Sequence, residues 1–121
     1  MQDFKKLRVW AQAHAFSLNV RRATRRWPRE FSSLKSQLIR AANSIAANIV
    51  EGCSAESPAE FARFLQMSIK SASETEYHLL DGKDNGLFTQ LTWRNLTADI
   101  GSIRAQTIAL RRKVLGEHAL R

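Results

Sequence analysis

The sequence predicts an all-α protein whose four helices form an up-down-up-down bundle. Apolar residues recur at steps of three and four through four separate segments, as they do along one face of a helix. Proline, glycine or a capping residue bounds each segment, so the connections are short. No segment shows the alternation of a half-buried strand. Four helices of roughly 20 residues with short connections pack most simply as antiparallel neighbours, so we expect residues 1–121 to form one domain.

The first helix is expected over residues 3–27. Asp3 is a suitable N-cap, because its side chain can accept hydrogen bonds from the free amides of a first turn. Pro28 ends the helix, since proline disfavours helical geometry in the residue before it. The apolar face of this segment has a spacing that suits antiparallel packing and consists of Val9, Ala13, Phe16, Val20, Ala23 and Trp27.

The second helix, expected over residues 33–51, has an unusual distribution of polar side chains. Its apolar residues cover about half of the cylinder, which is wider than the arc of an ordinary surface helix. We therefore expect burial on more than one side and an oligomer. Beside this arc runs a stripe that we name the polar seam: Gln37, Arg40, Ser44, Asn48 and Glu51. Gly52 is expected to take the left-handed conformation common just after a helix end.

The third and fourth helices have clear boundaries. Ser57 and Pro58 form a strong helix start, and Asn85-Gly86 is a stop, so the third helix is expected over residues 58–83. Its inner face is Phe61, Phe64, Leu65, Ser68, Ala72, Thr75 and Leu79. The fourth helix is expected over residues 90–115, followed by a loose tail, with an inner face made of Trp93, Leu96, Ile100, Ile103, Thr107, Leu110 and Val114.

Partners for the polar seam are expected on the third helix. In an antiparallel pair that turns near residue 55, position 40 faces about position 70, which brings Arg40 near Ser71 and Glu74. Glu76 is expected on the inner face of the same helix. A buried seam must be hydrogen-bonded and its charges paired. It then serves either as a structural network that fixes helix register, which we favour, or as a pocket for a ligand or RNA.

Composition and charge indicate a globular, cytoplasmic protein with an acidic partner. Lys and Arg number 19 and Asp and Glu 11, so the net charge is +8, a balance that favours nucleic acid. The alternative is a basic surface that is merely solvated. No apolar run is long enough to span a membrane, and the N-terminus lacks the apolar core of a signal peptide. The single Cys53 fits a reducing compartment.

No residue pattern supports an enzyme, a metal site or a cofactor. His14, His78 and His118 lie on different segments, and none belongs to an H-x-x-x-H or E-x-x-H motif. Glu74 and His78 are four residues apart, which favours a surface pair over a ligand set. Cys53 has no histidine near it in the sequence, and there is no glycine-rich phosphate loop or Ser/His/Asp arrangement.

Basic residues crowd the end of the first helix and the start of the second. We name as the basic cluster Arg21, Arg22, Arg25, Arg26, Arg29 and Lys35. In an up-down bundle, Lys83 and Arg94 lie at the same end. The other end also carries cations, diluted by Glu56 and Glu60: Lys5, Lys6, Arg8, Arg111, Arg112 and Lys113. Arginine suits phosphate contacts because its guanidinium presents a fork of donors, so the basic cluster is the expected nucleic-acid site.

Several motifs resemble a known family. They are L-x-V-W-x-x-A at residues 7–13, W-P-x-E at 27–30, Q-L-x-R-A-A-x-S-I-x-x-N-I-x-E-G at 37–52, E-F-x-x-F-L at 60–65 and S-x-x-E-x-E at 71–76. In these the chain resembles the bacterial four-helix-bundle proteins of the 23S rRNA intervening-sequence type. One departure is Lys70-Ser71, where the family usually has Gly-Ser.

The resemblance implies a homopentameric barrel. It also implies a link to nucleic acid, because distant relatives serve diversity-generating retroelements and bind reverse transcriptase and nucleic acid through a basic surface. We therefore expect a non-enzymatic, homo-oligomeric bundle that binds RNA or DNA, with RNA favoured. The alternative is a protein adaptor that docks an acidic partner such as a reverse transcriptase.

Overall fold

The computed structural model describes residues 2–116 and contains four long helices and two short 3-10 turns. The helices are α1 (Arg8–Thr24), α2 (Ser32–Cys53), α3 (Pro58–Asp84) and α4 (Gln90–Val114), and the 3-10 turns are η1 (Phe4–Lys6) and η2 (Arg29–Phe31). No strand occurs among the described residues. The expected bounds of the last three helices agree with the observed ones to within two residues. The tail after Gly116, including His118, lies outside the described residues.

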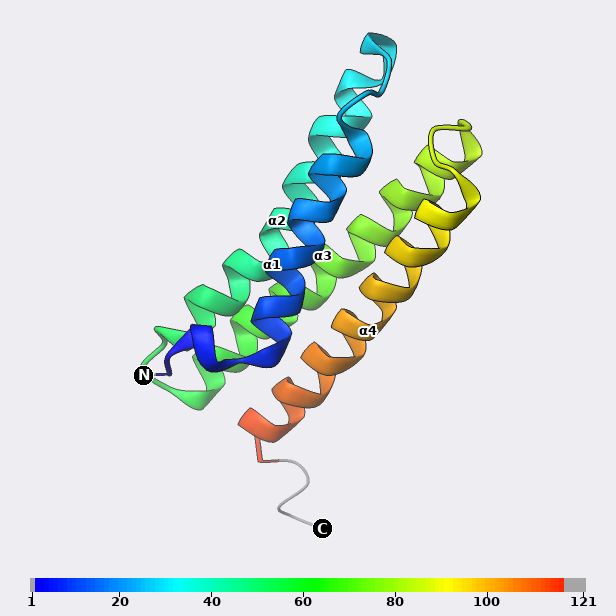
Figure 1. The fold of residues 1–121 in the computed structure, drawn as a ribbon. Helices are drawn as coiled ribbons and strands as arrows, with labels where there is room; N and C mark the ends of the chain where they lie inside the picture. The colour runs from blue at the N-terminus through cyan, green and yellow to red at the C-terminus, as the bar shows by residue number, and fades with distance from the viewer. Residues whose placement is uncertain (1, 117–121) are drawn as a thin grey trace.

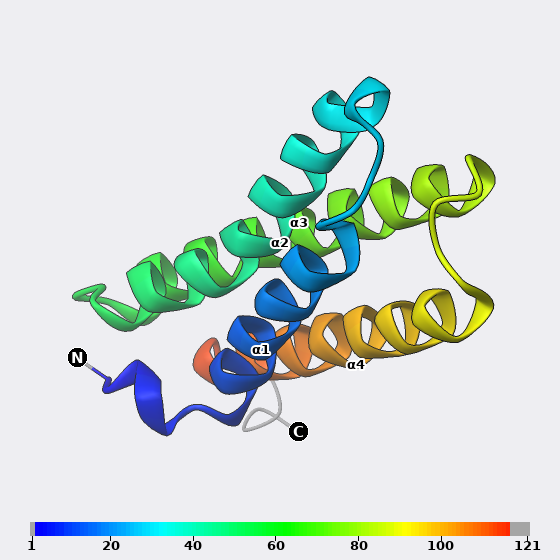
Figure 2. The same ribbon diagram turned by 45° about the horizontal axis from the view of Figure 1, so that its top comes forward.

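The four helices run up, down, up and down, and each packs against the next (Figure 1). α1 also packs on α4, whereas α1 and α3 are not neighbouring helices and lie diagonally across the bundle. The α1–α2 and α3–α4 connections lie at the same end, where the two helix pairs splay apart in both views (Figures 1 and 2). The all-α fold with four helices is therefore confirmed.

The core is built from the apolar faces that the spacing predicts. Largest among its fully buried side chains are Phe16, Leu38, Ile45, Ile49, Leu65, Leu79, Ile100 and Ile103. α2 packs on both α1 and α3, and this explains its wide apolar arc within a single chain. Ile39 and Val50, at the margins of that arc, are half-buried. The arc therefore does not itself require a second copy, and the expected oligomer stays a prediction.

The first helix is shorter than expected at both ends. Asp3 does act as an N-cap, but it caps η1, where its carboxylate accepts from the Lys5 amide at 3.1 Å. Leu7 is extended, so α1 begins only at Arg8. At the other end α1 stops at Thr24, three residues before Trp27. The buried residue of its last turn is accordingly Thr24, whose hydroxyl donates to the Val20 carbonyl at 3.0 Å.

Local signals set most of the other boundaries. Ser57 accepts from the Glu60 amide at 3.1 Å, and Thr89 accepts from the Thr92 amide at the same distance. Gly86, after α3, has a φ of 72°. Gly52 differs from expectation, because it is helical and buried inside α2. A Cβ there would lie 2.8 Å from the Phe61 ring, so close packing, and not a left-handed φ, accounts for this glycine.

No helix among residues 2–116 combines the length and the hydropathy that a membrane-spanning helix needs.

Candidate nucleic-acid interface

The basic cluster lies on three consecutive pieces of backbone at the splayed end of the bundle. Arg21 and Arg22 are in the last turn of α1, Arg25 and Arg26 follow it, Arg29 begins η2, and Lys35 is in the first turns of α2. The five arginines are exposed and Lys35 is half-buried. The Arg22 guanidinium donates to the Asn19 side-chain oxygen at 3.1 Å, which holds one of these cations along α1.

Trp27 fixes the backbone that carries the cluster. Its indole meets the Phe88 ring edge-on, with ring centroids 5.2 Å apart. Both rings close over Gly82 of α3, where a Cβ would lie 2.7 Å from Phe88 and 3.0 Å from Trp27. The contact ties the α1–α2 connection to the α3–α4 connection. The missing side chain of Gly82 is therefore what allows the arginine-rich segment to dock on α3.

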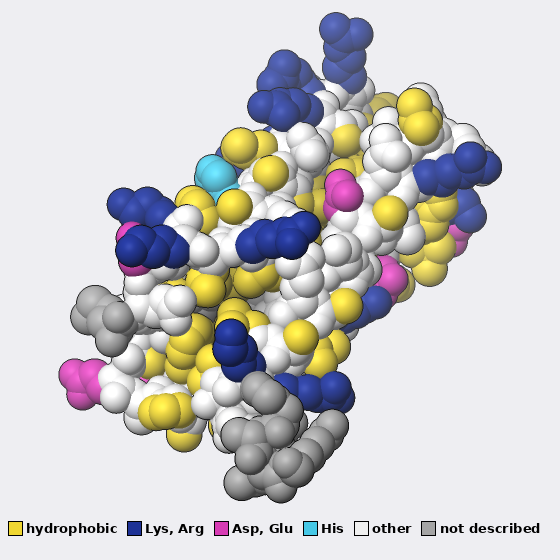
Figure 3. All heavy atoms as spheres, turned by 60° about the horizontal axis from the view of Figure 1, so that its bottom comes forward, with side chains coloured by type: hydrophobic (Ala, Val, Ile, Leu, Met, Phe, Trp, Pro, Cys, Tyr) yellow, Lys and Arg dark blue, Asp and Glu magenta, His cyan; other side chains and the backbone are white. Residues whose placement is uncertain are grey.

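Charge is distributed unevenly over the bundle. Residues 4–29 contain eight Lys or Arg and no Asp or Glu, and Asp99 is the only acidic residue of α4. Figure 3 shows a face on which Lys and Arg side chains are spread widely and crowd near the end where α1 leads into α2, whereas Asp and Glu side chains are few. On α1 the cations therefore gather at the two ends of the helix, because no Lys or Arg occurs between Arg8 and Arg21.

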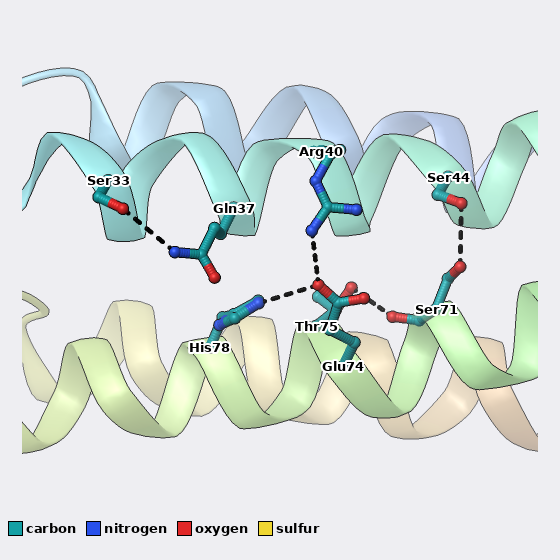
Figure 4. A network of polar contacts seen from close by, with 8 residues as sticks. All are labelled: Ser33, Gln37, Arg40, Ser44, Ser71, Glu74, Thr75 and His78. Atoms are coloured by element: carbon teal, nitrogen blue, oxygen red, sulfur yellow. Dashed lines mark hydrogen bonds and ion pairs between the residues drawn. The ribbon is translucent and has the colours of Figure 1, made fainter.

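The polar seam does meet α3, and the contacts form a row between the two helices (Figure 4). Arg40 donates to Glu74 at 2.9 Å, and the same carboxylate oxygen lies 3.1 Å from Nε2 of His78. Further along, the Ser44 and Ser71 hydroxyls are 2.9 Å apart. These pairings agree with the expected register. The Asn48 amide donates to the Ser44 carbonyl and hydroxyl.

The seam is nevertheless a surface feature and not a buried one. The side chains of Arg40 and Glu74 are 66% and 41% exposed, and Gln37 and Glu51 are exposed as well. The long arginine side chain lets its guanidinium reach solvent, as arginine and lysine commonly do. An ion pair as exposed as this one contributes little to stability, so a role of the seam in fixing helix register stays a prediction. The hollows between α1 and α4 and the one beside Cys53 are lined by none of the seam residues.

Three individual expectations are corrected or completed. Glu76 does not join the seam, because it receives a hydrogen bond from Arg104 of α4 at 2.7 Å. His78 is buried, and its Nδ1 has no hydrogen-bond partner among residues 2–116. Lys70, the departure from the family pattern, is exposed, while Ser71 reaches Ser44. The lysine therefore does not intrude between the helices.

Neither a metal site nor a reactive thiol is apparent in the described chain. Within residues 2–116 no group of three or more His, Cys, Asp or Glu side chains is arranged to hold a metal ion. Burial raises the pKa of the Cys53 thiol above its usual 9.0, and the Asp3 carboxylate raises it further. A raised pKa leaves the sulfur protonated and unreactive at neutral pH.

A groove between α1 and α4 was not anticipated. Two adjoining hollows, of about 230 and 340 Å³, share Asn19 and Asp99 in their walls. A sequence signal for it exists, because polar residues recur at steps of four, three and four on the outer side of α4, at Asn95, Asp99, Ser102 and Gln106. Periodicity alone could not reveal that α1 lies far enough away to leave an opening.

Comparison with known proteins identifies the family. Residues 5–109 match the family described as 23S rRNA-intervening sequence protein. The chain belongs to this family. A solved structure, a protein of unknown function from the S23 ribosomal protein family of Bacteroides thetaiotaomicron, is similar with a TM-score of 0.79 at 26% identity. The match covers 86% of this chain and 98% of that one. No curated protein matches the chain.

The family assignment confirms the resemblance that the motifs suggested. All of the quoted motifs, from Leu7 to Glu76, lie within the matched residues. Neither the family description nor the description of the solved relative names an enzymatic activity.

Proposed function

We propose that this 23S rRNA-intervening sequence protein is a non-enzymatic, homo-oligomeric bundle that binds structured RNA through phosphate contacts of its basic cluster. The observation that supports this most directly is the charge distribution, with eight cations and no acid in residues 4–29. Phosphate binding requires several cations on one surface, and each neutralised phosphate releases counterions. The rigid attachment of this segment through Trp27 favours binding, because the cations lose little freedom when RNA docks.

Self-association is proposed through the outer side of α3. Met67, Tyr77 and Leu80 are exposed there, with Tyr77 at 61%, and the family resemblance implies a pentamer. The cations of the basic cluster lie on α1, the α1–α2 connection and α2, so subunits joined through the outer side of α3 leave them free. Repetition of the cluster around a ring converts weak single contacts into avidity.

The test is a salt titration of RNA binding by three proteins. We compare the wild type with a variant of the cluster, Arg22→Gln/Arg26→Gln/Arg29→Gln, whose three side chains are exposed. The matched control, Lys5→Gln/Lys6→Gln/Arg8→Gln, removes the same charge from the other end of the same segment. Affinity for a structured RNA is measured by fluorescence anisotropy across a range of salt concentrations.

The cluster variant should bind all RNA sequences more weakly and flatten the plot of log affinity against log salt by about two units. The control should retain most of the wild-type slope. If the two variants reduce RNA affinity and the salt slope equally, the basic cluster is not the binding site. Absence of RNA binding by the wild type would refute the proposal and leave an acidic protein partner, such as a reverse transcriptase, as the hypothesis to test.

A further inference from the structure

The groove between α1 and α4 combines an apolar floor with polar walls. Phe16 and Ile103, both nearly inaccessible, lie at its base. The polar wall residues are Gln12, Asn19, Asn95, Asp99 and Ser102. Arg22, a member of the basic cluster, lines the second hollow. An apolar floor with a few directed polar groups is typical of sites for small, flat ligands.

The hydrogen bonds that the wall residues already make determine which of their donors and acceptors remain free for a ligand. The Gln12 oxygen accepts from Gln106, and the Asn19 oxygen accepts from Arg22. The amide nitrogens of both α1 residues make no hydrogen bond within residues 2–116, so they remain free to donate. Opposite them on α4, Asp99 makes no hydrogen bond or ion pair within residues 2–116, and a carboxylate only accepts. The groove offers amide donors from α1 and, on α4, the two acceptor oxygens of Asp99 beside the side chains of Asn95 and Ser102.

We propose that this groove binds an unpaired guanine base of the RNA. The inference rests on the proposed RNA-binding function and names the base that such an RNA presents. Guanine carries two adjacent donors, N1–H and the 2-amino group, which match the two oxygens of Asp99. Its O6 acceptor faces the amide donor of Asn19, which lines both hollows together with Asp99. The phosphate of the same nucleotide reaches Arg22.

Other occupants fit the groove less well. A free anion is repelled by Asp99, and a metal ion finds only one carboxylate in the groove walls. Adenine, cytosine and uracil each lack the pair of adjacent donors on one edge. Sequence-specific reading of RNA usually targets unpaired bases, whose Watson–Crick edges are free. Asp99 is the only acidic residue on α1 or α4. Its charge repels the phosphates of any RNA, whereas its oxygens accept hydrogen bonds from guanine.

The experiment uses the full chain and a set of RNA hairpins that differ at one loop position. That position is guanine, inosine, adenine, cytosine or uracil, and affinity is measured by fluorescence anisotropy. Asp99→Asn is compared with Asp84→Asn, which removes the same charge from the exposed end of α3. Guanosine monophosphate alone is titrated in parallel to distinguish a free nucleotide from a base within RNA.

We expect wild type and Asp84→Asn to prefer the guanine hairpin by about five- to a hundredfold. Inosine, which lacks the 2-amino group, should lose part of this preference. Asp99→Asn should lower affinity for the guanine hairpin and leave or raise affinity for the others, because a repulsive charge is removed. A merely structural role of Asp99 would shift all hairpins together.

The failure of this inference can be distinguished from the failure of the proposed function. Salt-dependent binding of all hairpins without a base preference overturns the guanine site and leaves RNA binding by the basic cluster intact. If guanosine monophosphate binds in an Asp99-dependent way but the hairpins show no preference, the groove does not bind a base within RNA. It then binds a free nucleotide. Absence of binding to every hairpin overturns both proposals.

Discussion

The close contact at Gly82 predicts that Gly82→Ala destabilises the bundle, whereas Gly101→Ala stabilises it. Both glycines lie inside helices, so alanine gains up to about 1 kcal/mol in helix propensity at each. The surroundings differ, because a Cβ at Gly101 meets nothing within 4 Å, whereas at Gly82 it would lie 2.7 Å from Phe88 and 3.0 Å from Trp27. Gly101 is therefore a matched control for the propensity gain.

The magnitude follows from this difference. Forcing an extra methyl group into a packed site costs about 1–3 kcal/mol, and the propensity gain largely cancels between the two variants. We expect Gly82→Ala to be less stable than Gly101→Ala by about 1–3 kcal/mol. Urea unfolding followed by circular dichroism measures this, at one protomer concentration because an assembly would make stability concentration-dependent.

A double-mutant cycle locates the origin of the effect. Phe88→Leu removes the ring that the new methyl group meets, so Gly82→Ala should cost less in the Phe88→Leu background than in the wild type, with a coupling of about 0.5 kcal/mol or more. Gly82→Ala should also weaken RNA binding, because displacement of Trp27 frees the segment that bears Arg25 and Arg26. Equal stability of Gly82→Ala and Gly101→Ala would refute the idea that this contact fixes the α1–α2 connection.

Three further predictions concern stability. Arg40→Ala should cost less than about 1 kcal/mol, because Arg40 and Glu74 are exposed, whereas Ile45→Ala in the core should cost about 2–5 kcal/mol in the same urea assay. Ser57→Ala should cost about 0.5–2 kcal/mol through loss of the α3 cap. Burial raises the pKa of Cys53, so the folded state holds its proton longer and the free energy of unfolding should fall as pH rises above about 9; Cys53→Ala should lessen this fall.

The helices could be predicted because their signals are local and periodic. Spacing at steps of three and four marks the face that packs, and Val9, Ala13, Phe16 and Val20 are all buried. The break at Leu7 could not be found this way, because the apolar spacing does not report a backbone turn. Asp3 caps either a short 3-10 turn or a long helix, and only tertiary contacts select between them.

The polar seam was predicted in position and register but not in burial. A helical wheel gives the direction of a side chain but not how far it extends toward solvent. The pairing of Arg40 with Glu74 could therefore be predicted, but the exposure of both side chains could not. The groove escaped prediction for a related reason. Its walls come from helices about 80 residues apart in the chain, and the distance between them depends on how the whole bundle splays.

The same splay links the two proposed parts of the RNA site. Trp27 and Phe88 pack where the helix pairs separate. Asn19 and Arg22 lie on α1, shortly before Trp27 in the sequence, and line the groove. A chain of RNA whose phosphates follow the basic cluster would therefore pass the mouth of the groove. Phosphate contacts alone bind all sequences alike, so in this proposal it is the Asp99 carboxylate in the groove that would distinguish one base from another.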